Sequence, residues 1–307
     1  MHMHEINRDT GAHPTDRIAA ATSMGAVTLL VGDLDAMTRY YRDVITLTVL
    51  DAAGDAVTLG RAGRPLVILR HAPALRHAGA GSAGLFHTAI LFESQPALAA
   101  ALYSLARRAP GTFTGSADHL VSQAFYATDP EGNGIELYWD RDRTEWSWTH
   151  GQVEMATLAL DPNAFIAEHL SAEGAAAAEG ATARDGASIG HVHLSVGDIA
   201  TARAFYVDAL GFDATATLGN QALFVSAGGY HHHMAMNVWN SRGAGPRMPA
   251  LGLGRINLVL PGADALGEVA QRLAHHGFAV RDDGRTLSFD DPWNNTLHAT
   301  APARDDG

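Results

Sequence analysis

Two stretches of the chain share one pattern: GAVTLLVGDLDAMTRYYRDVITLTVL at residues 25–50 and GHVHLSVGDIATARAFYVDALGFDAT at residues 190–215. They align without a gap. Each begins with a short alternating segment typical of a strand, passes through Val-Gly-Asp, and continues into an amphipathic helical segment with an aromatic pair before another strand. This repeat predicts that the two halves of the chain are built on one plan.

Each half divides again. Residues 85–110 and 253–278 both read as an alternating strand, a turn and an amphipathic helix, and residues 124–139 and 287–300 both read as a strand, an Asp-Pro turn and a strand. The sequence therefore predicts an α+β fold of four βαβββ modules, with helices on one side of mixed or antiparallel sheets.

The same pattern sets the expected domain limits. We expect a flexible N-terminus at 1–22, a first domain with two modules at 23–141, a linker segment at 142–187 and a second domain with two modules at 188–302. The stretch at 170–188 is rich in Ala and Gly, which favours either a linker or a short helix.

Composition narrows the function. The 307 residues carry a formal charge of −12, which leaves no broad basic face and argues against nucleic acid as a partner. The chain has no cysteine, so any metal chemistry falls to its 17 histidines. The start is polar and no long apolar stretch follows, so we expect a cytoplasmic protein without a membrane partner.

The module pattern resembles the vicinal oxygen chelate superfamily, which includes glyoxalase I, extradiol dioxygenases and bleomycin-binding proteins. The resemblance implies that pairs of modules, in two vicinal-oxygen-chelate domains, curl their sheets into cups, with metal ligands on the first and last strand of a module. The first-strand position stands five residues before the end of the strand, which gives Ala26, His87, His191 and Arg255. The last-strand position stands seven residues after the Asp of Asp-Pro, which gives Glu136 and His298.

Only part of this set suits a metal. His87, Glu136 and His191 form a two-histidine, one-carboxylate triad, the kind that holds Fe(II) and leaves positions open; Mn(II) is the alternative ion. His87 and His191 taken singly also fit hydrogen-bonded core histidines. Glu136 is harder to explain in that way, because a carboxylate within an apolar strand is costly unless it is paired or metal-bound. Ala26, Arg255 and His298 suggest no second metal.

A finer resemblance is to extradiol dioxygenases, and most to the two-domain catechol-2,3-dioxygenase subgroup of Bacillus type. It rests on GSADHLVSQAFYATDPEGNGIELYW at 115–139 and FVSAGGYHHH at 224–233. The sequence departs from the family pattern by two extra residues before Phe125, which separate Asp118 and His119 from Tyr126. The resemblance implies catalytic roles for Tyr126, His231, His232 and His233, and substrate contacts from Asp118, His119, His193, Asn237 and Trp239.

The three consecutive histidines at 231–233 cannot all face the cup if they lie in a strand. We expect residues 231–233 to lie in the last strand of the third module, where alternation would direct His231 and His233 into the cup and leave His232 on a packing face with methionines. The triad is complete without them, so they are better suited to acid–base work beside the metal.

The resemblance implies an Fe(II)-dependent extradiol dioxygenase that takes a catechol-type aromatic diol and O2. The alternative is a glyoxalase-like, metal-dependent isomerase or lyase with four protein ligands. Because the predicted ligands fall in the second and third modules, the cup must cross the domain boundary, within one chain or between chains. We expect one metal per chain and a homo-oligomer.

Overall fold

The computed structural model describes residues 16–178 and 185–302, and it confirms the four βαβββ modules. The first contains β2 (Val27–Val31), α1 (Leu34–Arg39) with its π-helical continuation η2 (Tyr40–Val44), β3 (Thr48–Ala53), β4 (Ala56–Arg61) and β5 (Arg64–His71). The second contains β6 (Gly84–Phe92), α2 (Gln95–Arg108), the short 3-10 turn η3 (Pro110–Thr112), β7 (Phe113–Asp118), β8 (Ser122–Thr128) and β9 (Gly134–Asp140).

The second half repeats this order. The third module contains β12 (Ala187–Ser195), α5 (Ile199–Arg203) with η5 (Ala204–Ala209), β13 (Asp213–Leu218), β14 (Ala222–Ser226) and β15 (Met234–Asn237). The fourth contains β16 (Gly252–Val259), α6 (Ala263–His275), β17 (Arg281–Asp282), β18 (Thr286–Asp290) and β19 (Thr296–Thr300).

The two large sheets each combine one module from each half. The second and third modules form the sheet β13-β14-β15-β12-β6-β9-β8-β7, and the fourth and first form β17-β18-β19-β16-β2-β5-β4-β3, with β1 (Ser23–Met24) beside β16. The seams are antiparallel, β6 with β12 and β2 with β16. The question left open by the sequence is thereby answered: the cup closes within one chain, and the expected domains 23–141 and 188–302 share both sheets.

The repeated motif that opens each half now has a physical role. Its aspartate caps the following helix, since Asp33 accepts the backbone N–H of Ala36 and Asp198 accepts that of Thr201. Its aromatic pair fixes an Asp-Pro turn in the neighbouring module: Tyr41 donates to Asp129 at 3.1 Å and Tyr206 donates to Asp291 at 2.9 Å. Burial raises the pKa of both carboxyl groups, whose oxygens also accept amide hydrogen bonds from their own turns. Each motif therefore sets the start of a last strand, β9 or β19.

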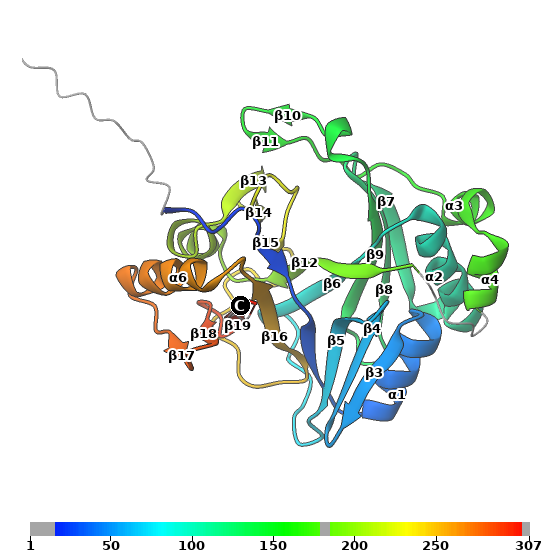
Figure 1. The fold of residues 1–307 in the computed structure, drawn as a ribbon, viewed down its shortest axis with the longest axis horizontal. Coiled ribbons are helices and arrows are strands. Elements are labelled where there is room, and N and C mark those ends of the chain that lie inside the picture. Colours follow the sequence, from blue (N-terminus) through cyan, green and yellow to red (C-terminus); the bar gives the residue numbers. More distant parts are fainter. Residues whose placement is uncertain (1–15, 179–184, 303–307) are drawn as a thin grey trace, which may run out of the picture.

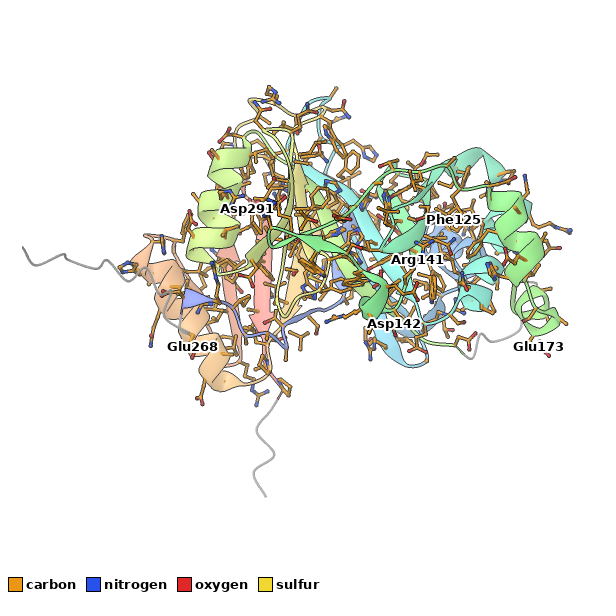
Figure 2. The ribbon with its side chains drawn as sticks, turned by 90° about the horizontal axis from the view of Figure 1, so that it is seen from above. Phe125, Arg141, Asp142, Glu173, Glu268 and Asp291 are labelled. Carbon is orange, nitrogen blue, oxygen red and sulfur yellow. The ribbon has the colours of Figure 1, made fainter. Side chains whose placement is uncertain are left out.

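Helices cover one face of each sheet and leave the other for a site. In Figure 1, α6 lies at one end of the molecule and α2 at the other, with the strands between them. Figure 2 shows the same separation from above through Glu268 on α6 and Glu173 on α4 (Ala172–Ala178). Along β9, Ile135 and Leu137 enter the main apolar core, so Glu136, Tyr138 and Asp140 face the opposite side.

The segment expected to be a linker, 142–187, is folded where the structure describes it. A short turn, η4 (Arg143–Glu145), precedes the hairpin of β10 (Trp148–Thr149) and β11 (Gln152–Val153). Trp146 and Val153 are buried with Val121 and Tyr230. Two helices follow, α3 (Pro162–His169) and α4, and both pack on α2, which favours the short-helix alternative for the Ala-rich stretch; residues 179–184 lie outside the described ones.

The expected flexible N-terminus is partly wrong. Residues 1–15 lie outside the described part, but Ile18 is buried in the core and its N–H donates to the carbonyl of Gly211 at 2.8 Å. Because Ile18 bridges to the third module, residues 16–22 belong to the folded unit. No helix among the described residues is long and apolar enough to cross a membrane.

Candidate metal centre

Three adjacent strands bring the predicted ligands together. His87 lies on β6, Glu136 on β9 and His191 on β12, and these strands are neighbours in the order β12-β6-β9. Glu136 Oε2 lies 3.0 Å from His87 Nε2 and 3.1 Å from His191 Nε2, and the two Nε2 atoms are 3.3 Å apart. All three side chains are buried: His87 is 6% exposed, Glu136 3% and His191 2%. We call the face that carries them the metal cup.

The donor set fits a metal ion. Two nitrogens about 2.1 Å from one ion and at right angles to each other are separated by about 3.0 Å, close to the spacing observed here. Both Nε2 atoms point at one carboxylate oxygen and lie 3.3 Å apart, so two donated protons would crowd a point that a single cation would fill. Within residues 16–178 and 185–302 this is the only group of three such side chains.

The protonation states also suit ligation. Burial alone raises the pKa of Glu136, but the His191 and His87 imidazoles more than offset this and hold it well below its usual range. Burial lowers the pKa of His191, although the Glu136 charge opposes the shift. An ionised carboxylate and neutral imidazoles are the forms that bind a metal.

Tyr126 and His119 stand together at one side of the triad. Tyr126 pairs with Glu136 across β8 and β9. His119 Nδ1 lies 2.7 Å from the carbonyl of Ala156, which fixes its proton there, so His119 Nε2 accepts the Tyr126 hydroxyl at 2.7 Å. Burial and the Glu136 charge raise the pKa of Tyr126 well above its usual range, so Tyr126 stays a hydrogen-bond donor.

His193, Asn237 and Trp239 form the opposite side. The Asn237 side-chain oxygen accepts the N–H of Trp239, which turns its amide nitrogen toward His193 Nε2 at 3.0 Å. The His193 ring lies 4.9 Å from that of His87 and 5.5 Å from that of Trp239, between ring centroids. Trp239 is 46% exposed, so this side of the cup reaches the surface. Phe86, which the sequence did not suggest, contacts both rings, with centroids 4.9 Å from His193 and 5.3 Å from Trp239.

The triple histidine departs from the predicted arrangement. Residues 231–233 form a bent connection and β15 begins only at Met234, so strand alternation does not apply to them. The expected orientation is therefore wrong for two of the three: the His232 ring packs on the His191 ring at 4.1 Å, whereas His233 Nδ1 accepts the backbone N–H of Ala227 at 3.2 Å. Burial lowers the pKa of His232 well below its usual range, and neighbouring imidazole charges lower it further.

His231 connects the cup to a carboxylate that the sequence did not suggest. Asp140 Oδ1 lies 2.9 Å from His231 Nε2, and its Oδ2 accepts the Tyr230 hydroxyl at 2.7 Å. With its Nε2 proton directed at Asp140, a neutral His231 accepts through Nδ1, 2.8 Å from His232 Nδ1. His232 then carries its proton on Nδ1 and has an unprotonated Nε2. The sequence did hold a signal, because Asp140 follows Glu136 by four residues on one strand and so shares its face.

Asp118 is placed differently from the other candidates. Arg141 binds it in a bidentate manner at 2.9 and 2.6 Å, and the N–H of Leu120 also donates to it. Its carboxylate is thus fully engaged beside the cup, where it holds the loop that carries His119. The structure brings Asp118 to this loop and not to the triad.

Comparisons with known proteins agree with the fold. The model of the Glyoxalase/Bleomycin resistance protein/Dioxygenase superfamily matches residues 23–137 and 188–298. A catechol-2,3-dioxygenase of Bacillus subtilis (strain 168) is 37% identical over 276 residues, which cover 88% of this chain and 94% of that protein.

Solved structures resemble the chain in fold. A protein of Bacillus subtilis subsp. subtilis strain 168 has a TM-score of 0.61 at 14% identity and covers 93% of this chain and 86% of its own. Glyoxalase I of Zea mays has a TM-score of 0.55 at 16% identity over 92% of each chain. At these identities the likeness concerns the fold alone.

Proposed function

The chain belongs to the Glyoxalase/Bleomycin resistance protein/Dioxygenase superfamily, and from this premise we propose that it is an Fe(II)-dependent extradiol dioxygenase acting on a catechol-type diol and O2. The observation that carries the proposal is the convergence of His87, Glu136 and His191 on one point of a buried cup. A relative named as a catechol-2,3-dioxygenase, similar over nearly its whole length, supports the same chemistry.

The triad would hold iron and leave the remaining positions of a six-coordinate ion open. When bound, Fe(II) supplies a centre at which a diol and dioxygen can be activated together. Mn(II) has the same ligand preferences at such a site and is the alternative ion. The cup wall near the triad is apolar, with Ala89, Ala124 and Tyr138 packed together, which suits a flat aromatic ring and excludes water.

The protein groups around the triad divide into a donor side and an acceptor side. Tyr126 keeps its proton and would donate a hydrogen bond to an anionic diol oxygen once it turns from His119. His232, whose ring lies 4.1 Å from that of His191 and whose Nε2 carries no proton, would offer a hydrogen-bond acceptor to a diol hydroxyl. Asp140 and His231 would hold His232 in the required tautomer.

The glyoxalase-like alternative is less well supported. It calls for a fourth protein ligand, and the sequence offered one of the histidines at 231–233 for that position. In the described part of the chain the potential metal group holds three residues, and His232 stacks on a ligand ring without joining that group. Three protein ligands would leave three positions of a six-coordinate ion, enough for the two oxygens of a diol and for dioxygen, as the dioxygenase reaction needs.

The test is anaerobic reconstitution with Fe(II), Mn(II) or Zn(II), followed by catechol and then oxygen. We expect a yellow ring-fission product, one O2 consumed per ring opened, and activity with Fe(II) exceeding that with Zn(II). His191→Ala serves as the metal-free control, with circular dichroism to confirm folding. Absence of colour with several catechols, or turnover of an α-ketoaldehyde thiol adduct without oxygen, would reject the dioxygenase in favour of the alternative.

A further inference from the structure

The sheet formed by the first and fourth modules has a face that corresponds to the metal cup, position by position. β2 pairs with β16 as β6 pairs with β12, and β16 is parallel to β19 as β6 is to β9. Arg255 opposes Thr28 on β2 just as His191 opposes Ala89 on β6. On β19, His298 pairs with Asn257 of β16. On β9, Glu136 pairs in the same way with Ala89 of β6. We call the face lined by Thr28, Arg255 and His298 the second cup.

The charges of the second cup are opposite to those of the metal cup. Where the metal cup has His191, the second has the cation Arg255, and where it has His87, the second has Ala26. Two positions of the second cup correspond to that of Glu136, His298 on β19 and Ile68 beside Thr28 on β5, and neither is a carboxylate. A site that has lost its carboxylate and gained a guanidinium cannot hold a metal cation but suits an anion.

Arg255 has no acidic partner in the described structure. Its Nε is buried without a hydrogen-bond partner, and no ion pair involves its guanidinium among these residues. Burial lowers the pKa of Arg255, and the charge of Arg70 lowers it further, so its strongest charged neighbour has the same sign. A half-buried arginine next to another arginine is unfavourable unless a counter-charge is supplied.

A second polar group in the same place also lacks a partner. Thr28 is 5% exposed, and its hydroxyl has no hydrogen-bond partner. Its neighbours Val27 and Leu29 enter the core, so Thr28 faces the second cup, opposite Arg255. Buried hydroxyls are normally hydrogen-bonded, so an unpartnered one beside an unpartnered guanidinium nitrogen marks a position for an oxygen ligand.

The acids of the region are already engaged. Asp290 accepts from Arg281 at 2.9 Å and from the Thr296 hydroxyl at 2.7 Å. Asp283 accepts the backbone N–H groups of Arg285 and Thr286 in its own turn. Neither carboxylate is paired with Arg255, so the positive charge of Arg255 and Arg70 is left for an external anion.

We propose that the second cup binds a small oxyanion, the phosphate or carboxylate group of a small molecule, with Arg255 as its principal contact and Thr28 and His298 beside it. The guanidinium offers two parallel N–H donors that match two oxygens of such a group, and the Thr28 hydroxyl offers a third. The site is independent of the proposed reaction, since it lies in the other sheet.

The test uses the full-length, iron-loaded protein with two separate probes, inorganic phosphate and acetate. Thermal unfolding and isothermal titration calorimetry are measured against chloride at matched ionic strength, because a ligand that binds only the folded state raises the Tm. We expect at least one probe to raise the Tm in a saturable manner. The probe that does so identifies the group as phosphate-like or carboxylate-like.

Arg255→Gln should abolish that rise, or weaken binding by about tenfold or more, as the loss of a charge-assisted contact requires. Arg255→Lys, which keeps the charge without the paired donors, should bind more weakly than wild type and serves if Arg255→Gln does not fold. Arg39→Gln makes the same charge change on exposed α1 and is the matched control. His191→Ala should leave anion binding unchanged. No rise with either probe, or an equal rise in Arg255→Gln and Arg39→Gln, would overturn the proposal.

Discussion

At the scale of single residues, the candidate centre depends on the hydrogen bonds of the side chains around the triad as much as on the triad itself. His87, Glu136 and His191 converge, but what stands beside them is set by hydrogen bonds from elsewhere: Ala156 fixes the tautomer of His119, and Asp140 fixes that of His231. A histidine whose proton position is fixed can act only as donor or only as acceptor at its other nitrogen. These fixed tautomers are what give the cup its donor side and its acceptor side.

Asp140→Asn tests the acceptor side. An amide has one acceptor oxygen where the carboxylate has two, so either His231 or Tyr230 loses its acceptor and the tautomer of His232 is no longer imposed. We expect kcat to fall by about 10- to 100-fold while iron content stays near that of wild type. Steady-state kinetics and metal analysis on the same preparation provide the two readouts.

Asp142→Asn is the matched control, because Asp142 is exposed and lies two residues further on. It should keep wild-type turnover. If Asp140→Asn loses iron in proportion to activity, Asp140 serves only to maintain the structure of the site. If the variant keeps full turnover, the carboxylate does not contribute to the reaction.

His233 makes stability depend on pH. Burial lowers its pKa to about 3, and the charges of His231, Arg143 and His191 contribute to the same shift. Between pH 6.5 and 3 the unfolded chain therefore binds a proton at this histidine that the folded chain does not. Stability present above pH 6.5 is lost as the pH falls, by about 1.4 kcal/mol per pH unit from this one group.

His233→Asn should remove that contribution, since its side-chain oxygen can still accept the N–H of Ala227 but has no proton to gain. Urea unfolding of chelator-treated protein at pH 7, 6 and 5 measures the effect. The variant should lose less stability on acidification than wild type does, and parallel curves for the two would contradict the assignment.

The sequence predicted some of these residues and not others, for a physical reason. The three ligands follow from counted distances to turns, and turn residues such as Asp129 and Pro130 are visible in the sequence. The orientation of the triple histidine could not be predicted from alternation, because alternation holds only inside a strand and β15 begins after His233. The tautomers of His119 and His231 depend on contacts with residues more than 30 positions away, Ala156 and Asp140.

At the scale of elements, the segment between the two halves illustrates how composition can mislead. The stretch at 170–188 is rich in Ala and Gly, as a linker is, yet α3 directly before it is packed against the sheet: Phe165 is 3% exposed and its ring lies 4.8 Å from that of Phe125 on β8. A single buried aromatic residue is enough to fasten a short helix, although it hardly changes the average composition. The neighbouring β10–β11 hairpin is held in the same way by Trp146.

Phe165→Ala measures how firmly α3 is attached. Removing a buried aromatic side chain leaves a cavity, and we expect the free energy of unfolding to fall by about 3 to 4 kcal/mol. Urea unfolding monitored by circular dichroism gives this value. Glu168→Ala on the same helix is the control, since that side chain is 74% exposed and should change stability by about 0.5 kcal/mol or less. An equally small change for both would show that α3 is only loosely attached.

At the scale of the whole molecule, module order along the chain does not tell which modules share a sheet. The sequence gives each module its strand–helix–strand pattern, but pairing between modules depends on contacts between residues far apart, such as His193 with His87. The triad shows this most clearly: two ligands precede the connection between the halves and one follows it. The site is complete within one chain, so a homo-oligomer, if formed, is not required to build it.

Both sheets are built jointly by the two halves of the chain, so separating the halves should disrupt both. If the chain is divided between Ala178 and Asp185, fragment 1–178 carries His87 and Glu136 and fragment 185–307 carries His191. Alone, each fragment would expose one edge of both antiparallel seams, β6 and β2 in the first, β12 and β16 in the second, together with the apolar core face behind them. We expect each fragment alone to bind less than about a tenth of the iron of the intact chain and to aggregate or unfold without a cooperative transition.

Co-expressed, the fragments should associate through both seams and recover one iron per pair, as seen by size-exclusion chromatography and metal analysis. Stoichiometric iron in fragment 1–178 alone would contradict a triad shared between the halves, and a cooperative thermal transition in either fragment would contradict the joint folding of the two sheets.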